Sequence, residues 1–134
     1  MKLSRSTGYA VLAVGYIAQR KNQNIILSQD IAEAYDIPLE YLLKILQQLV
    51  RASVLNSKRG PRGGFSLAKP TSKITLLDII EAVDGPMINQ FHLAKQAKGQ
   101  RFSTQADKVY EMAIAKARAV FAKAKVSALV GSKK

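Results

Sequence analysis

A short basic turn is the part of the sequence best suited to binding chemistry, because it gathers cations where the chain reverses. Residues 58–67 read KRGPRGGFSL and place Lys58, Arg59 and Arg62 among glycines and a proline. Glycine tolerates positive φ and proline fixes φ near a turn value, so two short strands joined here would form a hairpin with arginine at its tip. Such a tip can bind phosphate. A solvated basic loop explains the same charges, and the preceding elements must decide between the two.

The segment before this turn predicts an amphipathic helix over residues 38–51. Its apolar side chains recur at i, i+3, i+4 and i+7, which gives one core stripe of Leu42, Ile45, Leu46 and Leu49. The other side is polar and partly cationic, and its side chains can reach base edges or phosphates. The outer and flanking residues are Glu40, Tyr41, Leu43, Lys44, Gln47, Gln48 and Arg51.

Some of these outer residues have two interpretations. Leu43 either contacts a thymine methyl or packs beside the hairpin, and we slightly favour packing. Gln47 and Gln48 can read adenine, but glutamine is also an ordinary residue of exposed helix surfaces. Glu40 fits DNA least well, because a carboxylate repels phosphate unless it accepts from cytosine N4 or pairs with Lys44 at i+4.

A shorter helix precedes the longer one and completes a motif. Ser28 is predicted to cap a helix over residues 29–35, and Asp36-Ile37-Pro38 ends it, because a residue before proline is pushed out of the helical region. A short helix, a tight turn and a longer helix with a polar outer face form a helix-turn-helix, and the hairpin that follows makes it winged. We therefore expect the longer helix in the major groove, while Arg59 and Arg62 reach phosphates or the adjacent minor groove.

Further elements are predicted on both sides of this motif. A first helix begins at Ser4 or Ser6 and runs to about Arg20, and residues 25–27 are a candidate short strand. Thr75 and Asp78 have capping-box spacing at the start of a helix over 76–83. Residues 86–101 show no period and are either a loop or a marginal helix. The expected core stripes are Tyr9, Leu12, Ala13, Tyr16 and Ile17 in the first helix and Leu77, Ile80 and Val83 in the later one.

The C-terminal part predicts a long helix from Ser103 or Thr104 to about Val126. Its apolar stripe is rich in alanine and would stay exposed on a single chain, so we infer that it packs against a partner subunit. The alternative, in which the helix folds onto its own domain, stays open. The stripe consists of Val109, Met112, Ala113, Val120, Phe121 and Ala124, with Ala117 beside them.

Composition favours a polyanionic partner. The 134 residues include 21 Lys and Arg against 9 Asp and Glu, a formal net charge of +12. Such an excess indicates nucleic acid first and anionic lipid second. The sequence has no apolar run of the roughly 18 residues that span a bilayer and no signal-peptide pattern at its start, so we expect a cytoplasmic protein.

Residue usage excludes several kinds of functional site. The chain has no cysteine, which excludes disulfides, thiolate nucleophiles and cysteine-ligated clusters. With His92 as its one histidine, it is poor in transition-metal ligands, and we expect no metal and no cofactor. His92 is better explained as a loop or packing residue than as a ligand. Asp78, Glu81 and Asp84 follow helical i, i+3, i+6 spacing, which would suit a metal site, but we expect Asp78 to cap its helix and Glu81 to be solvated. No P-loop or dinucleotide fingerprint is present, so an enzyme is disfavoured.

Four segments together resemble one family of bacterial winged-helix regulators, which includes the iron-sulfur cluster regulator, the nitric-oxide-sensitive repressor and the cysteine-metabolism repressor. The segments are SRSTGYAVLAVGYIA, LSQDIAEAYDIPLEYLLKILQQLV, SKRGPRGGFSLAKP and ITLLDIIEAVDG. The resemblance covers roughly residues 1–85. It implies a homodimer of two winged domains, held by crossed long helices on a partly palindromic operator.

The resemblance also implies roles for individual residues. Tyr41, Leu43 and Lys44 match the family's base-facing positions, and Arg59 matches its minor-groove arginine. Ser28 and Gln29 stand where the short helix meets the DNA backbone, and the amides at a helix N-terminus suit phosphate.

The sequence departs from the family pattern in two places. Glycine usually stands where this chain has Arg62, and several members bind an iron-sulfur cluster through three cysteines after the EAVDG segment, where this chain has none. Cluster sensing therefore does not carry over. The input signal, a small molecule or a protein, stays open.

These patterns predict a mainly α-helical fold with a small β wing. We expect a winged helix-turn-helix domain over residues 1–84, a variable loop or sensor segment over 85–102, and a dimerisation helix and tail over 103–134. The predicted function is a sequence-specific, homodimeric DNA-binding repressor without a cluster. The alternative is an architectural or RNA-binding protein, which would be equally sensitive to salt but would not discriminate between sequences.

Overall fold

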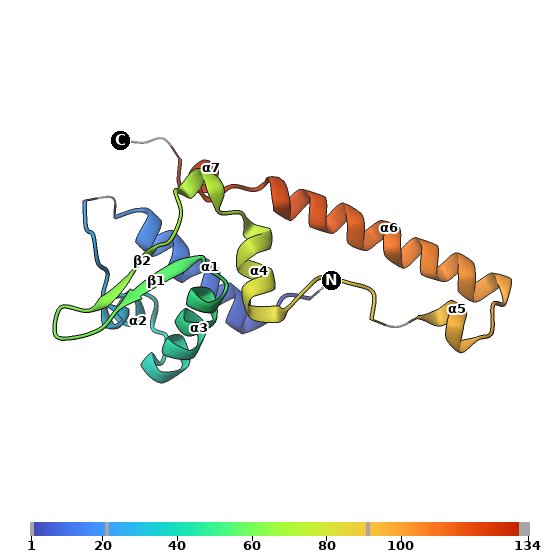
Figure 1. Cartoon of the computed structure of the whole chain (residues 1–134), viewed down its shortest axis with the longest axis horizontal. Coiled ribbons are helices and arrows are strands. Elements are labelled where there is room, and N and C mark those ends of the chain that lie inside the picture. Colours follow the sequence, from blue (N-terminus) through green and yellow to red (C-terminus); the bar gives the residue numbers. More distant parts are fainter. Residues whose placement is uncertain (1, 21, 91, 132–134) are drawn as a thin grey trace.

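The computed structural model describes residues 2–20, 22–90 and 92–131 of the chain. A helical domain with a two-stranded wing occupies one end of the molecule, and a single long helix, α6, extends from it toward the other end (Figure 1). The fold class expected from the sequence, mainly helical with a small β wing and a long C-terminal helix, is confirmed.

The first helix, α1 (Arg5–Ala18), begins at an N-cap serine, as expected. Thr7 N donates a hydrogen bond of 3.1 Å to Ser4 Oγ. The predicted core stripe is only partly correct, because Leu12 is 41% exposed and both tyrosines are half-buried. The core positions of α1 are instead taken mostly by small residues, and α1 packs against α4. The buried residues of α1 are Thr7, Ala10, Ala13, Val14, Ile17 and Ala18.

Helices α2 (Ser28–Tyr35) and α3 (Leu39–Arg51) form the predicted helix-turn-helix. Asp36, with φ of 55°, takes the left-handed conformation that ends α2, which Asp adopts more readily than most residues. The predicted cap by Ser28 is wrong: Leu27 occupies the cap position and makes no side-chain cap bond, while Ser28 is already helical. The expected core stripe of α3 is confirmed, since Leu42, Ile45, Leu46 and Leu49 are all buried.

The wing is an antiparallel pair of strands, β1 (Leu55–Lys58) and β2 (Gly64–Leu67), in which Lys58 pairs with Gly64. An isolated bridge between Ile26 and Phe65 attaches β2 to the segment before α2, so the strand expected over residues 25–27 is reduced to this one bridge. A Cβ on Gly64 would lie 2.5 Å from the Ile26 carbonyl oxygen. Glycine is therefore required there, and the close approach fixes the base of the wing.

Arg62 causes no backbone strain in this turn. The described non-glycine residues with positive φ are Asp36, Ser53 and Lys98, so Arg62 does not need the conformational freedom of glycine. Gly60 is the turn residue that does, with φ of 102°. An additional cation is thus accommodated at the tip of the wing.

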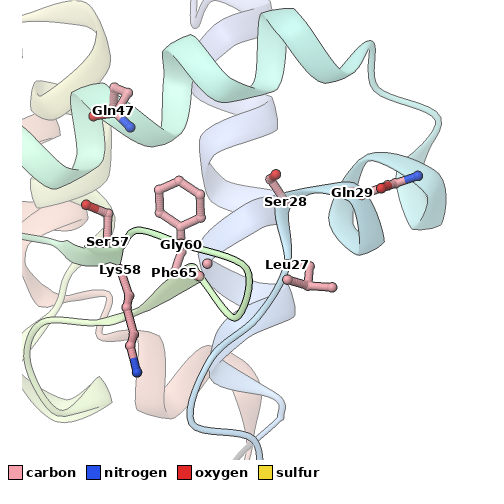
Figure 2. Close-up of a pocket in the computed structure, with 10 residues that line it drawn as sticks. Leu27, Ser28, Gln29, Gln47, Ser57, Lys58, Gly60 and Phe65 are labelled. Carbon is pink, nitrogen blue, oxygen red and sulfur yellow. The ribbon is translucent and has the colours of Figure 1, made fainter.

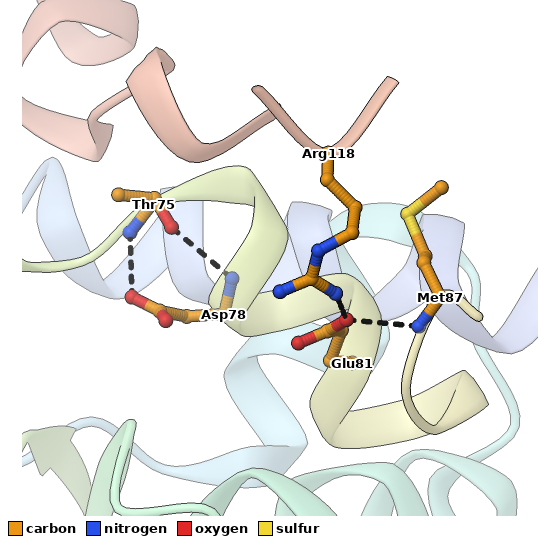
Figure 3. Close-up of polar contacts among 5 residues, drawn as sticks. All are labelled: Thr75, Asp78, Glu81, Met87 and Arg118. Carbon is orange, nitrogen blue, oxygen red and sulfur yellow. Dashed lines mark hydrogen bonds and ion pairs between the residues drawn. The ribbon is translucent and has the colours of Figure 1, made fainter. Parts of the chain in front are cut away.

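After the 3₁₀ turn η1 (Thr71–Lys73), helix α4 (Leu76–Asp84) begins with the predicted capping box. Asp78 N donates to Thr75 Oγ1 over 3.1 Å, and Thr75 N donates to Asp78 Oδ2 over 3.0 Å (Figure 3). Ile79 and Ile80 are the buried residues, whereas Leu77 and Val83 are only half-buried. Of the expected stripe, Ile80 is therefore confirmed as buried, whereas Leu77 and Val83 are not.

The C-terminal part consists of α5 (Leu93–Gln96), α6 (Arg101–Lys123) and α7 (Val126–Val130). The predicted end of the long helix near Val126 is wrong by one turn, and α7 was not expected. Leu76 N donates to the Ala124 carbonyl over 2.9 Å, and Val126 N donates to the Ile74 carbonyl over 2.8 Å. These bonds stop α6 and bring Val126, which is 4% exposed, into the core of the winged domain.

Candidate nucleic-acid interface

The outer face of α3 is open along its whole length. Because the inner stripe of the helix is buried in the domain, Glu40, Leu43, Lys44 and Gln47 face outward and are exposed, and Gln48 is half-buried. Leu43 is 36% exposed. The pairing of Glu40 with Lys44 suggested by their spacing is not formed, since the ion pair among the described residues joins Arg118 to Glu81.

Tyr41 is held against α1 and does not extend freely outward. Its hydroxyl shares a hydrogen bond of 2.6 Å with Ser6 Oγ, and its ring meets the Tyr9 ring edge-on at 5.5 Å between centroids. An edge-to-face pair of aromatic rings stabilises such an arrangement. Tyr41 therefore fixes the start of α3 relative to α1 and is half-buried.

A first hollow, of about 290 Å³, lies where α2, α3 and the wing meet. Figure 2 shows Ser28 and Gln29 at the start of α2, Gln47 on α3 and the Phe65 ring of the wing around it. Lys58 also lines it, so the structure brings together four of the residues expected to contact DNA. Ser57, which precedes Lys58, was missed, because a serine on an exposed strand gives no signal in the sequence. The lining residues are Leu27, Ser28, Gln29, Gln47, Ser57, Lys58, Gly60, Gly63, Gly64 and Phe65.

A second hollow, of about 510 Å³, lies on the other side of Gln47. It adds Arg51 and Ser6 to the predicted residues. Arg51 is seven positions after Lys44 and so shares its side of the helix, which agrees with its place among the outer residues expected from the sequence. The lining residues are Ser6, Tyr41, Lys44, Ile45, Gln47, Gln48 and Arg51.

The wing arginines line neither hollow, although Gly60 and Gly63 of the same turn line the first. Arg59 and Arg62 are exposed in the loop between β1 and β2, which is the extremity of the molecule farthest from α5 (Figure 1). Together with Lys58 on the same hairpin and Lys44 on α3, they make this side of the domain cationic. A surface of this charge and shape binds phosphate along a nucleic-acid duplex.

The long helix α6 has two different sides. Its one buried residue in the described chain is Ser103, whereas Phe102, Val109 and Val120 are 85%, 63% and 67% exposed. Of the other residues expected in the dimer stripe, Met112 and Ala113 are exposed and Phe121 is half-buried. Ala124 is the C-cap, not an interior helix residue. The helix contacts its own domain through the opposite side, along α4 and α5.

The carboxylates of α4 all have structural partners. Asp78 is in the capping box, as expected, but the expectation that Glu81 is solvated is wrong, because it accepts from Arg118 and from Met87 N. Asp84 accepts hydrogen bonds from Ser4 Oγ and Thr7 Oγ1 over 2.7 and 2.6 Å. Within residues 2–20, 22–90 and 92–131, no three His, Asp or Glu side chains gather at a point where they could hold a metal ion. The same ranges contain no helix with the length and apolar character of a membrane span.

Comparison with known proteins agrees with this geometry. The family model named Rrf2, described as an iron-dependent transcriptional regulator, matches residues 3–130. The HTH-type transcriptional regulator IscR of Cereibacter sphaeroides is 34% identical over 101 residues, which are 74% of this chain and 64% of that protein. A regulator-like sequence from Aquifex aeolicus is 41% identical over 81 residues, 60% of this chain and 56% of its own length. The matched region thus spans between about half and two thirds of the length of these curated relatives.

Solved structures extend the likeness to nearly the whole chain. The global cysteine regulator CymR of B. subtilis superimposes with a TM-score of 0.72 at 22% identity, covering 97% of this chain and 96% of that one. The oxidised form of CymR from Staphylococcus aureus covers 100% of this chain and 99% of its own, with a TM-score of 0.69 at 25% identity. An iron-sulfur cluster does not fit the present chain, because it has no cysteine and the described residues offer no substitute ligand set.

Proposed function

This chain belongs to the Rrf2 family of transcriptional regulators, and from that premise we propose that it is a homodimeric repressor of a partly palindromic DNA operator, acting in the cytoplasm without a cluster. The observation that carries the proposal is the continuous surface formed by α2, α3 and the wing. Gln47 lies between two hollows that gather the start of α2, the outer side of α3 and Lys58.

Helix α3 is the element that we place in the major groove. Its outer side chains include a lysine, an arginine and two glutamines, which suit phosphate oxygens and the edges of guanine and adenine. Lys44 and Arg51 can contact phosphate with little geometric constraint, whereas Gln47 and Gln48 would contribute base discrimination. Leu43, exposed beside them, would meet the methyl group of a thymine. Its exposure favours this role over packing against the wing.

The wing and the start of α2 supply contacts to the backbone and the minor groove. Ser28 and Gln29 open α2 with no side-chain cap, so the positive end of the helix is directed to phosphate. Arg59 at the exposed tip would enter a narrow minor groove, where the negative potential is strongest. Arg62 adds a second cation on the same hairpin.

The dimer follows from the exposed side of α6. A helix of 23 residues is about 34 Å long, and a repeated apolar stripe on such a helix is normally covered by another subunit. Two copies packed through Val109, Ala113 and Val120 would place two winged domains on one duplex, and half-sites one helical turn apart require this kind of spacing.

The test is selection of binding sites from randomised duplex DNA by the purified chain, at low and at physiological salt. We expect one sequence with two-fold symmetry to be enriched and to survive the higher salt. Recovery of bound DNA in which no sequence is enriched would contradict the proposal. It would favour the alternative of nonspecific nucleic-acid binding, for which the net charge of +12 is the supporting observation. A reporter placed behind the enriched site then distinguishes repression, in which transcription falls when the chain is expressed, from activation.

A further inference from the structure

A third hollow lies away from the DNA-facing surface, between the loop that follows α4 and the side of α6 that faces it. Its volume is about 770 Å³, within the range of small-molecule sites. Its walls are both apolar and charged. The lining residues are Glu81, Pro86, Met87, Ile88, Asn89, Gln90, His92, Glu111, Ile114, Ala115 and Arg118.

The helix wall of this hollow is a single stripe of α6. Glu111, Ile114, Ala115 and Arg118 stand at i, i+3, i+4 and i+7 and therefore share one side of the helix. Val109 and Val120 are each two residues away from a member of this stripe, a rotation of about 200°. The three residues through which we pair the two copies, Val109, Ala113 and Val120, thus point away from the hollow, and pairing through them leaves the hollow open.

A salt bridge joins the two walls. Arg118 of α6 donates to Glu81 Oε2 of α4, and Met87 N donates to the same oxygen over 2.8 Å (Figure 3). Arg118 and Glu81 retain 40% and 26% of their side-chain exposure, so both can be reached from solvent. Glu111, on the exposed part of the same α6 stripe, adds a second carboxylate. The charges therefore comprise one guanidinium and two carboxylates beside an apolar surface.

We propose that this hollow binds a small molecule that carries an ammonium and a carboxylate on an apolar body, the chemistry of a free amino acid. Its carboxylate pairs with Arg118, whose planar guanidinium binds carboxylates in a bidentate manner. Its ammonium pairs with a carboxylate of the hollow, Glu81 or Glu111, and its apolar body lies against Met87 and Ile114. A simple anion fits less well, because the carboxylates of the site outnumber its guanidinium.

Contacts of α4 connect this site to the DNA-binding surface. Asp84, the last residue of α4, accepts hydrogen bonds from Ser4 and Thr7 at the start of α1. Ser6 in the same turn is hydrogen-bonded to Tyr41 of α3. A ligand that separates Arg118 from Glu81 changes how α4 is held against α6 and so shifts the position of α3. This regulatory meaning rests on the proposed function, whereas binding to the hollow does not.

The binding test uses the full chain without DNA and the twenty standard amino acids at millimolar concentration, observed by ligand NMR and by the shift in melting temperature. We expect at least one amino acid with an apolar side chain to bind. Its decarboxylated amine and its deaminated acid, each lacking one charge, should bind at least about tenfold more weakly, because a hydrogen bond to a charged group contributes that much. Absence of binding by all twenty would overturn the proposal.

Two variants and a control locate the site. Arg118→Gln and Glu111→Gln should each weaken binding by about tenfold or more, and Glu111 is exposed, so its replacement leaves the fold intact. Lys73→Gln, at an exposed position of η1 outside the hollow, should bind as the unchanged chain does. Unchanged affinity in both site variants would place the ligand elsewhere and contradict the proposal.

The regulatory arm measures the affinity for the selected operator with and without the bound amino acid. Coupling is reciprocal, so the operator must change the amino-acid affinity by the same factor; we expect about fivefold or more. Binding without any coupling would refute the effector role. Failure to bind any amino acid by a chain that still selects a palindromic site would refute this inference and leave the proposed function standing.

Discussion

The winged domain and the C-terminal arm, residues 85–131, differ in how far their apolar side chains are buried. In the winged domain, α1, α3, the wing and α4 close one core, and the four core residues of α3 are each at most 1% exposed. In the arm, only Ser103 and Val126 are buried among the described residues, while Phe102, Val109 and Val120 face outward. The first region buries its apolar side chains within one chain, whereas the second leaves exposed the apolar side chains that we propose a second copy covers.

The largest difference is expected when the core of each region is truncated. Leu46→Ala removes a fully buried side chain from α3 and should lower the free energy of unfolding by about 2 to 5 kcal/mol. Met112→Ala on the arm should change it by less than about 0.5 kcal/mol in dilute protein, because exposed residues contribute little. Urea denaturation measures both. Equal losses in the two variants would mean that the arm is packed within its own chain.

The next largest effect concerns assembly. Val120→Asp places a charge in the proposed dimer stripe and should raise the dimer dissociation constant by about a hundredfold, since an unpaired buried charge is costly. Ala122→Asp introduces the same charge at an exposed position of α6 outside the stripe and is the matched control. Sedimentation equilibrium measures both dissociation constants. If Ala122→Asp dissociates the dimer and Val120→Asp does not, the stripe has been assigned to the wrong side.

A point substitution is a cleaner test of the dimer than removal of the arm. Truncation after Arg101 would also delete Val126, which lies in the core of the winged domain, and the backbone bonds between Ala124, Leu76 and Ile74. A truncated chain would therefore lose operator affinity through instability as well as through loss of the partner.

A smaller effect is expected at the tip of the wing. Arg59→Ala should weaken binding to the selected operator by about 1 to 3 kcal/mol and reduce the preference for A·T-rich flanks, if the side chain occupies a narrow minor groove. Lys95→Ala removes the same charge from α5, far from the wing, and should have little effect. Fluorescence anisotropy at fixed salt measures both affinities. An equal loss of operator affinity in the two variants would mean that Arg59 contributes only its positive charge and no specific contact in the minor groove.

The smallest effect is local to the winged domain. Thr75→Ala removes the capping-box bond at the start of α4 and should lower the free energy of unfolding by about 1 kcal/mol. Ser72→Ala, at a nearby exposed position of η1, is the control. Thermal unfolding compares the two, and a loss no larger for Thr75→Ala than for Ser72→Ala would show that the cap is not stabilising.

The sequence predicts features that depend on local signals better than features that depend on contacts between distant segments. The i, i+3, i+4, i+7 stripe of α3, the turn chemistry of the wing and the Thr75–Asp78 spacing are local signals, and each gave the observed structure. The end of α6 at Lys123 could not be predicted, because backbone bonds from Leu76 and to Ile74, distant in sequence, stop the helix. The burial of small residues in α1 in place of Leu12 likewise depends on how closely α4 approaches.

The candidate site shows the same limit. Lys44, Gln47 and the wing cations could be selected by residue type and helical spacing, and the structure brings most of them together. Tyr41 could not be understood from its own helix, because its partners, Ser6 and Tyr9, belong to α1. The salt bridge between Glu81 and Arg118 joins two helices separated by a segment without a regular pattern, so no pattern in the sequence predicts it.

The most direct test of the central claim, that the arm joins two winged domains on one operator, is the mass of the complex between the full chain and the selected duplex, measured by native mass spectrometry. The account predicts two chains on each duplex, and a complex of one chain or none for Val120→Asp under the same conditions. A saturated complex of one unaltered chain per duplex, bound with full affinity, would contradict it.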